Sequence, residues 1–205
     1  GHNSHLVIDN LGVKRSLGLL EIEVLVDPEP LGTSQSVRRA LDAYSQDEQF
    51  LVLLGDTSLA APLDLYFERW QSGGRPLAVL CHPNLHMHDS DILYLDERNI
   101  IREFTEKGAT RPVGTSFLKM AATGVLFFDR RAVMNGIGSE ADITKALIKG
   151  NLYQAGGEGL VASHYFKDSG TPARLSAIRD DFRTGAFYRR GSRSRPALIV
   201  DRDGT

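Results

Sequence analysis

The chain has little of three things that would narrow its class at once: cysteine, charge of one sign and long apolar runs. Its only cysteine is Cys81, so no intrachain disulfide can form and a reducing compartment is expected. The formal net charge is −2, which is too balanced to favour nucleic acid or a membrane surface as a partner. No apolar stretch approaches the roughly 18 residues of a membrane span, and the first five residues lack the pattern of a signal peptide. We therefore expect a cytoplasmic protein.

The sequence does contain an alternation of short apolar runs with helical patterns. With 205 residues, of which 41% are hydrophobic, the chain can bury a substantial core. Residues 21–26 alternate as a strand does, residues 32–44 carry helical spacing, and residues 50–54 form an apolar run. This order predicts a strand–helix–strand unit that is parallel and right-handed. The expected fold class is therefore α/β.

Further elements follow from the same patterns. Apolar runs predict strands, and a period near 3.6 residues predicts helices. Two of the strands, 92–95 and 100–104, are close enough in sequence to form a hairpin. The predicted strands are at 77–81, 92–95, 100–104, 125–128 and 160–164, and the predicted helices at 4–11, 63–70, 140–149 and 172–182.

Residues 189–196 interrupt the alternation. They are basic, contain glycine and serine, and have no apolar periodicity, which predicts an exposed linker. A phosphate-binding arm is the alternative. The linker divides the chain into a main domain, 1–188, and a tail, 197–205.

The tail carries two aspartates after an apolar run rich in β-branched residues. The run at 196–200 predicts a buried strand, so the following Asp-Arg-Asp-Gly-Thr places both carboxylates at its C-terminal end, where ligands bind in open α/β sheets. Asp-Gly is also an ordinary turn signal. The motif resembles the first motif of haloacid-dehalogenase-type phosphatases. The resemblance implies that Asp201 is a nucleophile, that Asp203 is the acid/base, and that both are magnesium ligands.

Five short segments of the main domain place polar residues or glycines at turns and strand ends. They are Pro-Leu-Gly-Thr at 30–33, Gly-Asp at 55–56, Glu-Lys at 106–107, Ala-Thr-Gly at 122–124 and Asp-Ser-Gly-Thr-Pro at 168–172. In order and spacing they resemble the sugar-phosphate nucleotidyltransferases, which join a sugar 1-phosphate to a nucleotide and release pyrophosphate. The resemblance covers residues 1–188. It implies a three-layer, Rossmann-like mixed sheet of the nucleotide-diphospho-sugar transferase type.

Two aspartates of these segments are candidate metal ligands. Asp56 ends a predicted buried strand, where a carboxylate can hold a metal that bridges nucleotide phosphates. Asp168 precedes a turn with Pro172 at the first helical position, so it can equally be a helix cap. The resemblance implies that Asp56 and Asp168 hold Mg²⁺ together, with phosphate and water as its remaining ligands.

The glycines that follow the first two predicted strands, Gly32 and Gly55, are candidate nucleotide contacts. Gly32 opens a helix, where the absence of a side chain lets a flat base approach the backbone. A turn that merely needs glycine is the alternative. The resemblance implies that Leu31, Gly32 and Gly55 contact the nucleoside triphosphate.

Two other segments, at 106–107 and 122–124, are candidates for binding the sugar phosphate. The resemblance implies that Glu106 binds sugar hydroxyls and that Lys107 binds the phosphate. It also implies that Thr123 and Gly124 leave room for the sugar or ribose. A solvated Glu-Lys pair and a β-bulge at the glycine are the structural alternatives.

Three histidines, at 82, 86 and 88, stand near Asp89 and Asp91. Their spacing does not match a zinc pattern. The segment resembles the nucleotidyltransferases that are fused to a haloacid-dehalogenase phosphatase and activate glycero-manno-heptose. There the phosphatase removes the 7-phosphate of the heptose bisphosphate, and the transferase attaches a nucleotide, often guanylyl, to the 1-phosphate. Thr123 departs from the asparagine that is commoner in that branch, which leaves the exact sugar open.

The resembled family also begins with a glycine-rich, arginine-containing loop and a lysine that this chain lacks. We therefore expect the chain to be an internal piece of a two-enzyme protein, inactive by itself. The two absent strands would lie between the strands at 21–26 and 50–54, so apolar edges would be exposed. The alternatives are a heptose bisphosphate phosphatase represented only by its first motif, and a nucleotidyltransferase-like module without catalysis.

Overall fold

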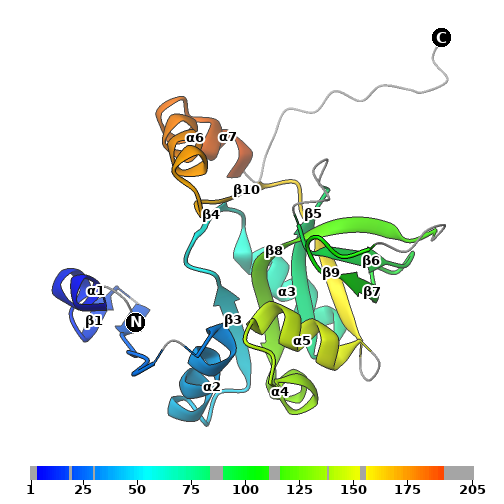
Figure 1. Ribbon diagram of the computed structural model, residues 1–205, viewed down its shortest axis with the longest axis horizontal. Coiled ribbons are helices and arrows are strands. Elements are labelled where there is room, and N and C mark those ends of the chain that lie inside the picture. The colour runs from blue at the N-terminus through cyan, green and yellow to red at the C-terminus, as the bar shows by residue number, and fades with distance from the viewer. Residues whose placement is uncertain are drawn as a thin grey trace.

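A mixed β-sheet forms the centre of the molecule (Figure 1). The computed structural model describes residues 4–18, 20–29, 31–83, 90–110, 116–137, 139–152 and 156–191. The strand order is β7–β6–β8–β5–β9, and β3 pairs with β8. β5 and β9 are parallel, whereas the other pairs are antiparallel. The bounds are β3 Gln49–Leu53, β5 Leu77–His82, β6 Ile92–Leu95, β7 Ile101–Thr105, β8 Leu118–Asp129 and β9 Gly157–Val161. The predicted α/β class is confirmed.

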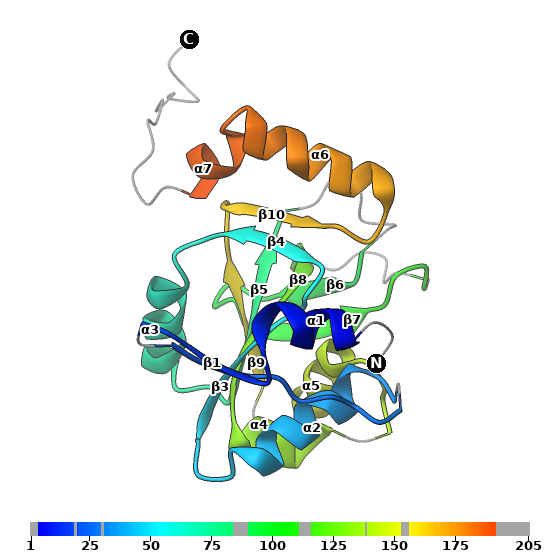
Figure 2. The ribbon, with the colours of Figure 1, turned by 90° about the vertical axis from the view of Figure 1, so that its left-hand side faces the viewer.

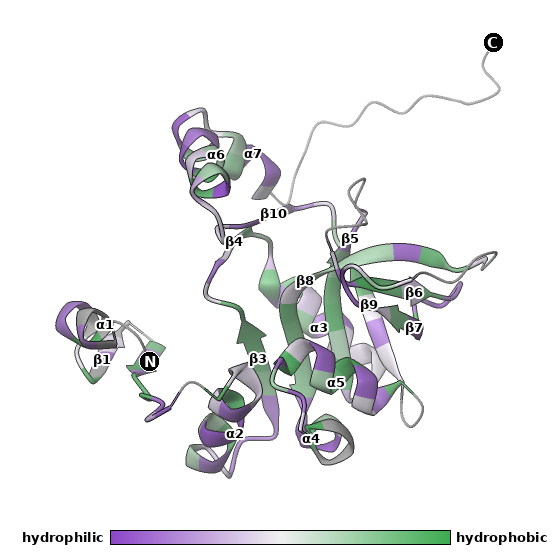
Figure 3. Ribbon diagram, viewed as in Figure 1, coloured by the Kyte–Doolittle hydropathy of each residue, from purple (hydrophilic) through white to green (hydrophobic). Residues whose placement is uncertain are grey.

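Helices pack on both faces of this sheet, which is why β5 and β6 are continuous apolar runs rather than alternating ones. On one face, α3 (Leu63–Gly73) packs Tyr66 and Trp70 against β5, β8 and β9. The other face is covered by α2 (Thr33–Ala43), α4 (Arg130–Gly136) and α5 (Ile143–Asn151). Figure 2 shows α3 on the opposite side of the sheet from α4 and α5. The central strands are also the most hydrophobic ribbons (Figure 3).

A two-stranded ribbon carries the last helices. β4 (Thr57–Ala60) pairs antiparallel with β10 (Tyr165–Asp168), and α6 (Pro172–Arg183) and α7 (Ala186–Gly191) lie over it (Figure 1). The Tyr165 hydroxyl donates to Asp181 Oδ2 at 2.7 Å, which ties β10 to α6. Of these four elements, the sequence patterns predict only α6.

The predicted parallel strand–helix–strand unit at 21–54 is wrong. β2 (Leu20–Glu23) pairs antiparallel with β1 (Lys14–Leu17), just after α1 (Ser4–Leu11), and this hairpin is separate from the central sheet. β2 is mostly exposed, so it has little apolar surface to bury in the sheet, and pairing with a sequence neighbour closes only a short loop. β3, whose Phe50 and Val52 pack on the core, joins the sheet antiparallel to β8.

Other predictions differ at their ends. The hairpin of β6 and β7 is confirmed. The helix predicted at 140–149 begins at Ile143 because Asp142 caps it, accepting from the backbone N–H groups of Thr144 and Lys145. Residues 189–191, assigned to the linker, are the last residues of α7, and residues 192–205 lie outside the described residues. Within the described part of the chain, no helix is long and apolar enough to cross a membrane.

Candidate active site

Asp56 and Asp168 are brought together by backbone contacts between distant parts of the chain. Asp56 stands in the turn between β3 and β4, and Asp168 ends β10 opposite Thr57. Ser169 donates its backbone N–H at 2.7 Å and its hydroxyl at 3.0 Å to the backbone oxygen of Asp56. A Cβ atom added to Gly170 would lie 3.3 Å from Asp168 Oδ1 and 4.0 Å from Asp56 Oδ2. The two carboxylates therefore face one small space.

That space belongs to a pocket of about 210 Å³. Four residues that the sequence predicted to bind metal or sugar phosphate line it together: Asp56, Asp168, Thr123 and Gly124. The other described lining residues are Leu54, Thr57, Ser90, Asp91, Ala122, Asp142 and Thr144.

Gly124 forms a β-bulge in β8 and also lines the pocket. Its φ is 75°, and the register between β5 and β8 shifts at this point. A Cβ on Gly124 would come within 2.7 Å of Leu54 Cδ1. Beside it, the Thr123 hydroxyl donates to the Leu80 backbone oxygen at 2.8 Å. The bulge thus interrupts the ladder where the pocket lies, as bulges near sites commonly do.

The donor set of this pocket fits Mg²⁺ held partly by a nucleotide. No hydrogen bond from the described residues reaches the Asp56 carboxylate, whereas Asp168 Oδ1 accepts from Gly170 N at 3.2 Å and from Arg174 Nη1 at 2.7 Å. Among the residues that the structure describes, no group of three histidine, cysteine or acidic side chains could hold an ion by itself. Mg²⁺ commonly takes one or two carboxylates and completes its shell with water and phosphate. His86 and His88 lie outside the described residues.

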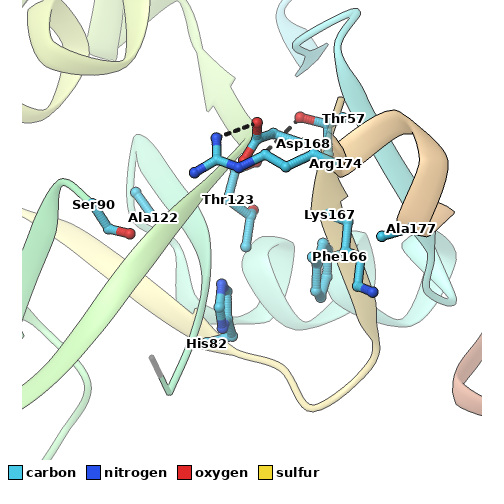
Figure 4. A pocket seen from close by; sticks show the side chains of 10 residues that line it. All are labelled: Thr57, His82, Ser90, Ala122, Thr123, Phe166, Lys167, Asp168, Arg174 and Ala177. Carbon is cyan, nitrogen blue, oxygen red and sulfur yellow. Dashed lines mark hydrogen bonds and ion pairs between the residues drawn. The ribbon is translucent and has the colours of Figure 1, made fainter. Parts of the chain in front are cut away.

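A larger pocket of about 460 Å³ adjoins the small one (Figure 4). The two share Thr57, Ser90, Ala122, Thr123 and Asp168, so they are parts of one cleft. The remaining described wall consists of His82, Phe166, Lys167, Arg174 and Ala177.

Two rings stand on the wall of the larger pocket. The rings of His82 and Phe166 are parallel within 6°, with centroids 6.2 Å apart. His82 Nδ1 lies 2.8 Å from the Pro83 backbone oxygen, which fixes the orientation of the imidazole. Figure 4 shows both rings edge-on.

Glu106 and Lys107 lie beside the cleft and line a separate pocket of about 530 Å³. Glu106 accepts hydrogen bonds from Lys145 Nζ at 2.7 Å and Lys149 Nζ at 2.6 Å. These two bonds lower the pKa of the Glu106 carboxyl to about 2. The backbone N–H of Lys107 donates to Asp91 Oδ1 at 2.7 Å. Asp91 lines the small pocket, so it links this segment to Asp56 and Asp168.

Leu31, Gly32 and Gly55 are not among the described residues that line these pockets. Gly32 precedes α2 with φ 92°, and a Cβ there would lie 2.5 Å from the Ala141 backbone oxygen. Glycine is therefore needed for α2 to pack against the segment before α5. Leu31 is exposed. A nucleotide contact at these three residues stays a prediction.

The structure adds site residues that the sequence motifs do not indicate. Thr144 is 5% exposed, and its hydroxyl is buried at the small pocket without a hydrogen-bond partner among the described residues. Asp142 had a usable signal, since an aspartate before a helical pattern is a typical cap. No sequence pattern indicated Arg174, because its partner Asp168 is six positions away and across a turn.

Asp201 and Asp203 lie outside the described residues. Their roles as nucleophile, acid/base and metal ligands stay predictions from the sequence.

Comparisons with known proteins identify the family from the sequence and the fold from the structure. The sequence model described as "Nucleotidyl transferase" matches residues 1–176. HddC from Yersinia pseudotuberculosis is similar in structure, with a TM-score of 0.68 and 18% identity, and its complex with GMP-PN gives 0.67 and 16%. Each match covers 88% of this chain and 75% of the other. No curated protein matches the chain.

A putative glucose-1-phosphate thymidylyltransferase from Bacillus anthracis, in complex with a sucrose, is also similar, with a TM-score of 0.61 and 17% identity. This match covers 78% of the chain and 63% of that protein. At such identities the structural similarities support the fold alone. The family match includes Asp56, Asp168 and Arg174 and ends before the aspartates of the tail.

Proposed function

Because the chain belongs to the nucleotidyl transferase family, we propose that the intact protein transfers a nucleotidyl group from a nucleoside triphosphate to a sugar 1-phosphate. The observation that carries this proposal is the placement of Asp56 and Asp168 around one small space at the end of a larger cleft. Two carboxylates beside a cleft suit a reaction between two phosphate-bearing substrates, since a divalent cation held there can bridge their oxygens.

The proposed chemistry is an in-line displacement at phosphorus. An oxygen of the sugar phosphate forms a bond to the α-phosphorus, and the bond to the pyrophosphate oxygen breaks, so that pyrophosphate leaves with the electron pair. Mg²⁺ bound by Asp56 and Asp168 would supply neutralisation of the charge that develops on the phosphates. The protein contributes mainly positioning of the two substrates. In this proposal Thr123 and Gly124 line the space for the sugar ring, and Lys107 faces the sugar phosphate. The expectation that Gly124 itself leaves room for the sugar is not carried over, because Leu54 fills the position of a Cβ there.

For the substrates we propose a heptose 1-phosphate and a guanine nucleotide. The His-Pro-Asn segment at 82–84 supports this choice by its resemblance to the heptose-activating branch. The likeness in fold to HddC, whose structure was determined with GMP-PN, agrees with it. The similar thymidylyltransferase makes thymidine triphosphate the alternative. Pyrophosphate release with each nucleoside triphosphate in turn decides between them.

The metal assignment is tested on the protein expressed from its complete coding sequence. Asp56→Asn and Asp168→Asn are each expected to lower Mg²⁺-dependent pyrophosphate release about 100-fold or more, the loss typical of removing one group that stabilises transition-state charge. Asp180→Asn is the matched control, since Asp180 is an exposed acid on α6 paired with Arg183. Turnover like that of the wild type in both site variants would reject the assignment.

A second activity, heptose bisphosphate phosphatase, is proposed for the tail on the strength of its Asp-x-Asp-Gly-Thr motif. Asp201→Asn should abolish phosphate release from heptose 1,7-bisphosphate and spare pyrophosphate release, because a carboxamide is a much poorer nucleophile than a carboxylate. Loss of both activities in a folded variant would indicate a single shared site. If the unaltered protein binds nucleotide but catalyses neither reaction, the non-catalytic alternative holds.

A further inference from the structure

Arg174 forms an ion pair with Asp168, one of the two carboxylates that face the small pocket. It stands in the first turn of α6, where its backbone N–H donates to the Thr171 hydroxyl oxygen at 3.2 Å. From there Nη1 reaches Asp168 Oδ1 at 2.7 Å. Figure 4 shows the side chain extended along the wall of the larger pocket with its guanidinium at Asp168.

Asp56 and Asp168 therefore differ in whether a positively charged side chain binds the carboxylate. Asp168 carries a cationic partner, whereas Asp56 receives no hydrogen bond from the described residues. A divalent cation held by Asp168 would bring a second positive charge next to the Arg174 guanidinium, and the two cations would repel each other. Arg174 and the divalent cation would therefore compete for the negative charge of Asp168.

The ion pair is exposed enough to be displaced. The side chains of Arg174 and Asp168 are 43% and 47% exposed, and pairs of this kind contribute little because water screens them. We propose that Arg174 is an exchangeable counter-ion of Asp168, which holds the carboxylate when no divalent cation is bound and gives it up when the cation arrives. This inference rests on the proposed function, because that function makes Asp168 a metal ligand.

The test measures binding of Mn²⁺, as a stand-in for Mg²⁺, to the protein expressed from its complete coding sequence, from the electron paramagnetic resonance signal of the free ion. Arg174→Gln should bind Mn²⁺ about two- to fivefold more tightly than the wild type, which is the size expected from an exposed ion pair. The gain should shrink as salt is added, since salt screens exposed charges. In the background of Asp168→Asn, the Arg174→Gln change should give no such gain.

Arg183→Gln is the matched control. Arg183 lies on the same helix and also forms an exposed ion pair, with Asp180 at 2.9 Å. Its loss removes the same charge away from the site and should leave Mn²⁺ affinity unchanged. Thermal unfolding of each variant verifies folding, and Arg174→Ala provides the same comparison if the glutamine variant does not fold.

The outcomes separate this inference from the proposed function. Equal Mn²⁺ affinity in Arg174→Gln and Arg183→Gln, with weaker binding by Asp168→Asn, overturns the exchange and leaves the metal site in place. A folded protein that binds no Mn²⁺ at millimolar concentration, with or without Arg174, overturns both. Tighter binding only when Arg174 is removed supports both.

Discussion

The Glu106 carboxylate is bound by two lysines of α5 rather than by water alone. Lys145 and Lys149, one helical turn apart, each donate to a different oxygen of the carboxylate. Lys149 also donates to Glu140 at 3.0 Å. The carboxylate proposed to bind sugar hydroxyls is thus ionised and fixed in direction before any substrate binds.

This environment predicts a dependence of stability on acid. The pKa of Glu106 is about 2 in the folded protein and near 4.3 in an unfolded chain. Its ionised form therefore stabilises the fold above about pH 4.3, and this contribution is lost as the pH falls toward 2. The side chain is 39% exposed, so screening limits the contribution to about 1 kcal/mol or less.

Glu106→Gln removes this pH-dependent contribution. Urea unfolding at pH 6 and pH 3.5 should show a smaller gap in unfolding free energy between the wild type and this variant at the lower pH. A gap that is the same at both pH values would contradict the assignment of the ion pairs to Glu106.

At the scale of elements, the start of α2 is fixed by its contact with the segment before α5. Gly32 has a left-handed φ, and Ser34 N donates to the Ala141 backbone oxygen at 3.0 Å. Thr33 continues the contact, because its Oγ1 accepts from Ile143 N at 3.0 Å. The two helices are therefore joined at their N-terminal ends, next to the small pocket that Asp142 lines.

Gly32→Ala should destabilise the protein by about 1–3 kcal/mol, the cost of a non-glycine residue held in such a conformation, with the clash against Ala141 adding to it. Gly55→Ala is the control, since a Cβ there meets nothing within 4 Å, and it should stay within about 0.5 kcal/mol of the wild type. The measurement is urea unfolding. Equal unfolding free energies for both variants would show that the contact with Ala141 relaxes freely.

At the scale of the whole molecule, β3 is an edge strand of the described sheet, and its only partner among the described strands is β8. Leu51 and Leu53 on this strand are 41% and 49% exposed. Figure 3 shows this apolar strand at the margin of the sheet. An exposed apolar edge invites pairing with another chain. The expectation that the strand at 21–26 shares this open edge is wrong, because β2 pairs with β1 outside the central sheet.

We expect residues 1–205 alone to self-associate through this edge. Leu53→Lys should lower the associated fraction in sedimentation velocity, because a charged residue on an edge strand opposes pairing. Leu65→Lys on α3, a residue that is 47% exposed, makes the same chemical change away from the edge and should not. A wild-type chain that is monomeric at all concentrations would contradict the prediction.

The sequence by itself determined the elements whose signals are local. The buried strand at 77–81, the hairpin of β6 and β7 and the helix α6 follow from apolar periodicity, a short turn and proline at a helix start. The positions of Asp56 and Asp168 at the ends of predicted elements follow from the same patterns. The family resemblance then indicated which of these ends to propose as a site.

Only the tertiary structure decided which of those ends meet. Asp56 and Ser169 are 113 residues apart in sequence, and no periodicity indicates that their backbones bond. No periodicity indicates that Lys145 and Lys149 bind Glu106 either. Nor does it indicate that β2 pairs with β1 rather than with the central sheet. Such contacts depend on the closure of long loops and on which apolar faces remain to be buried, and both are properties of the folded chain as a whole.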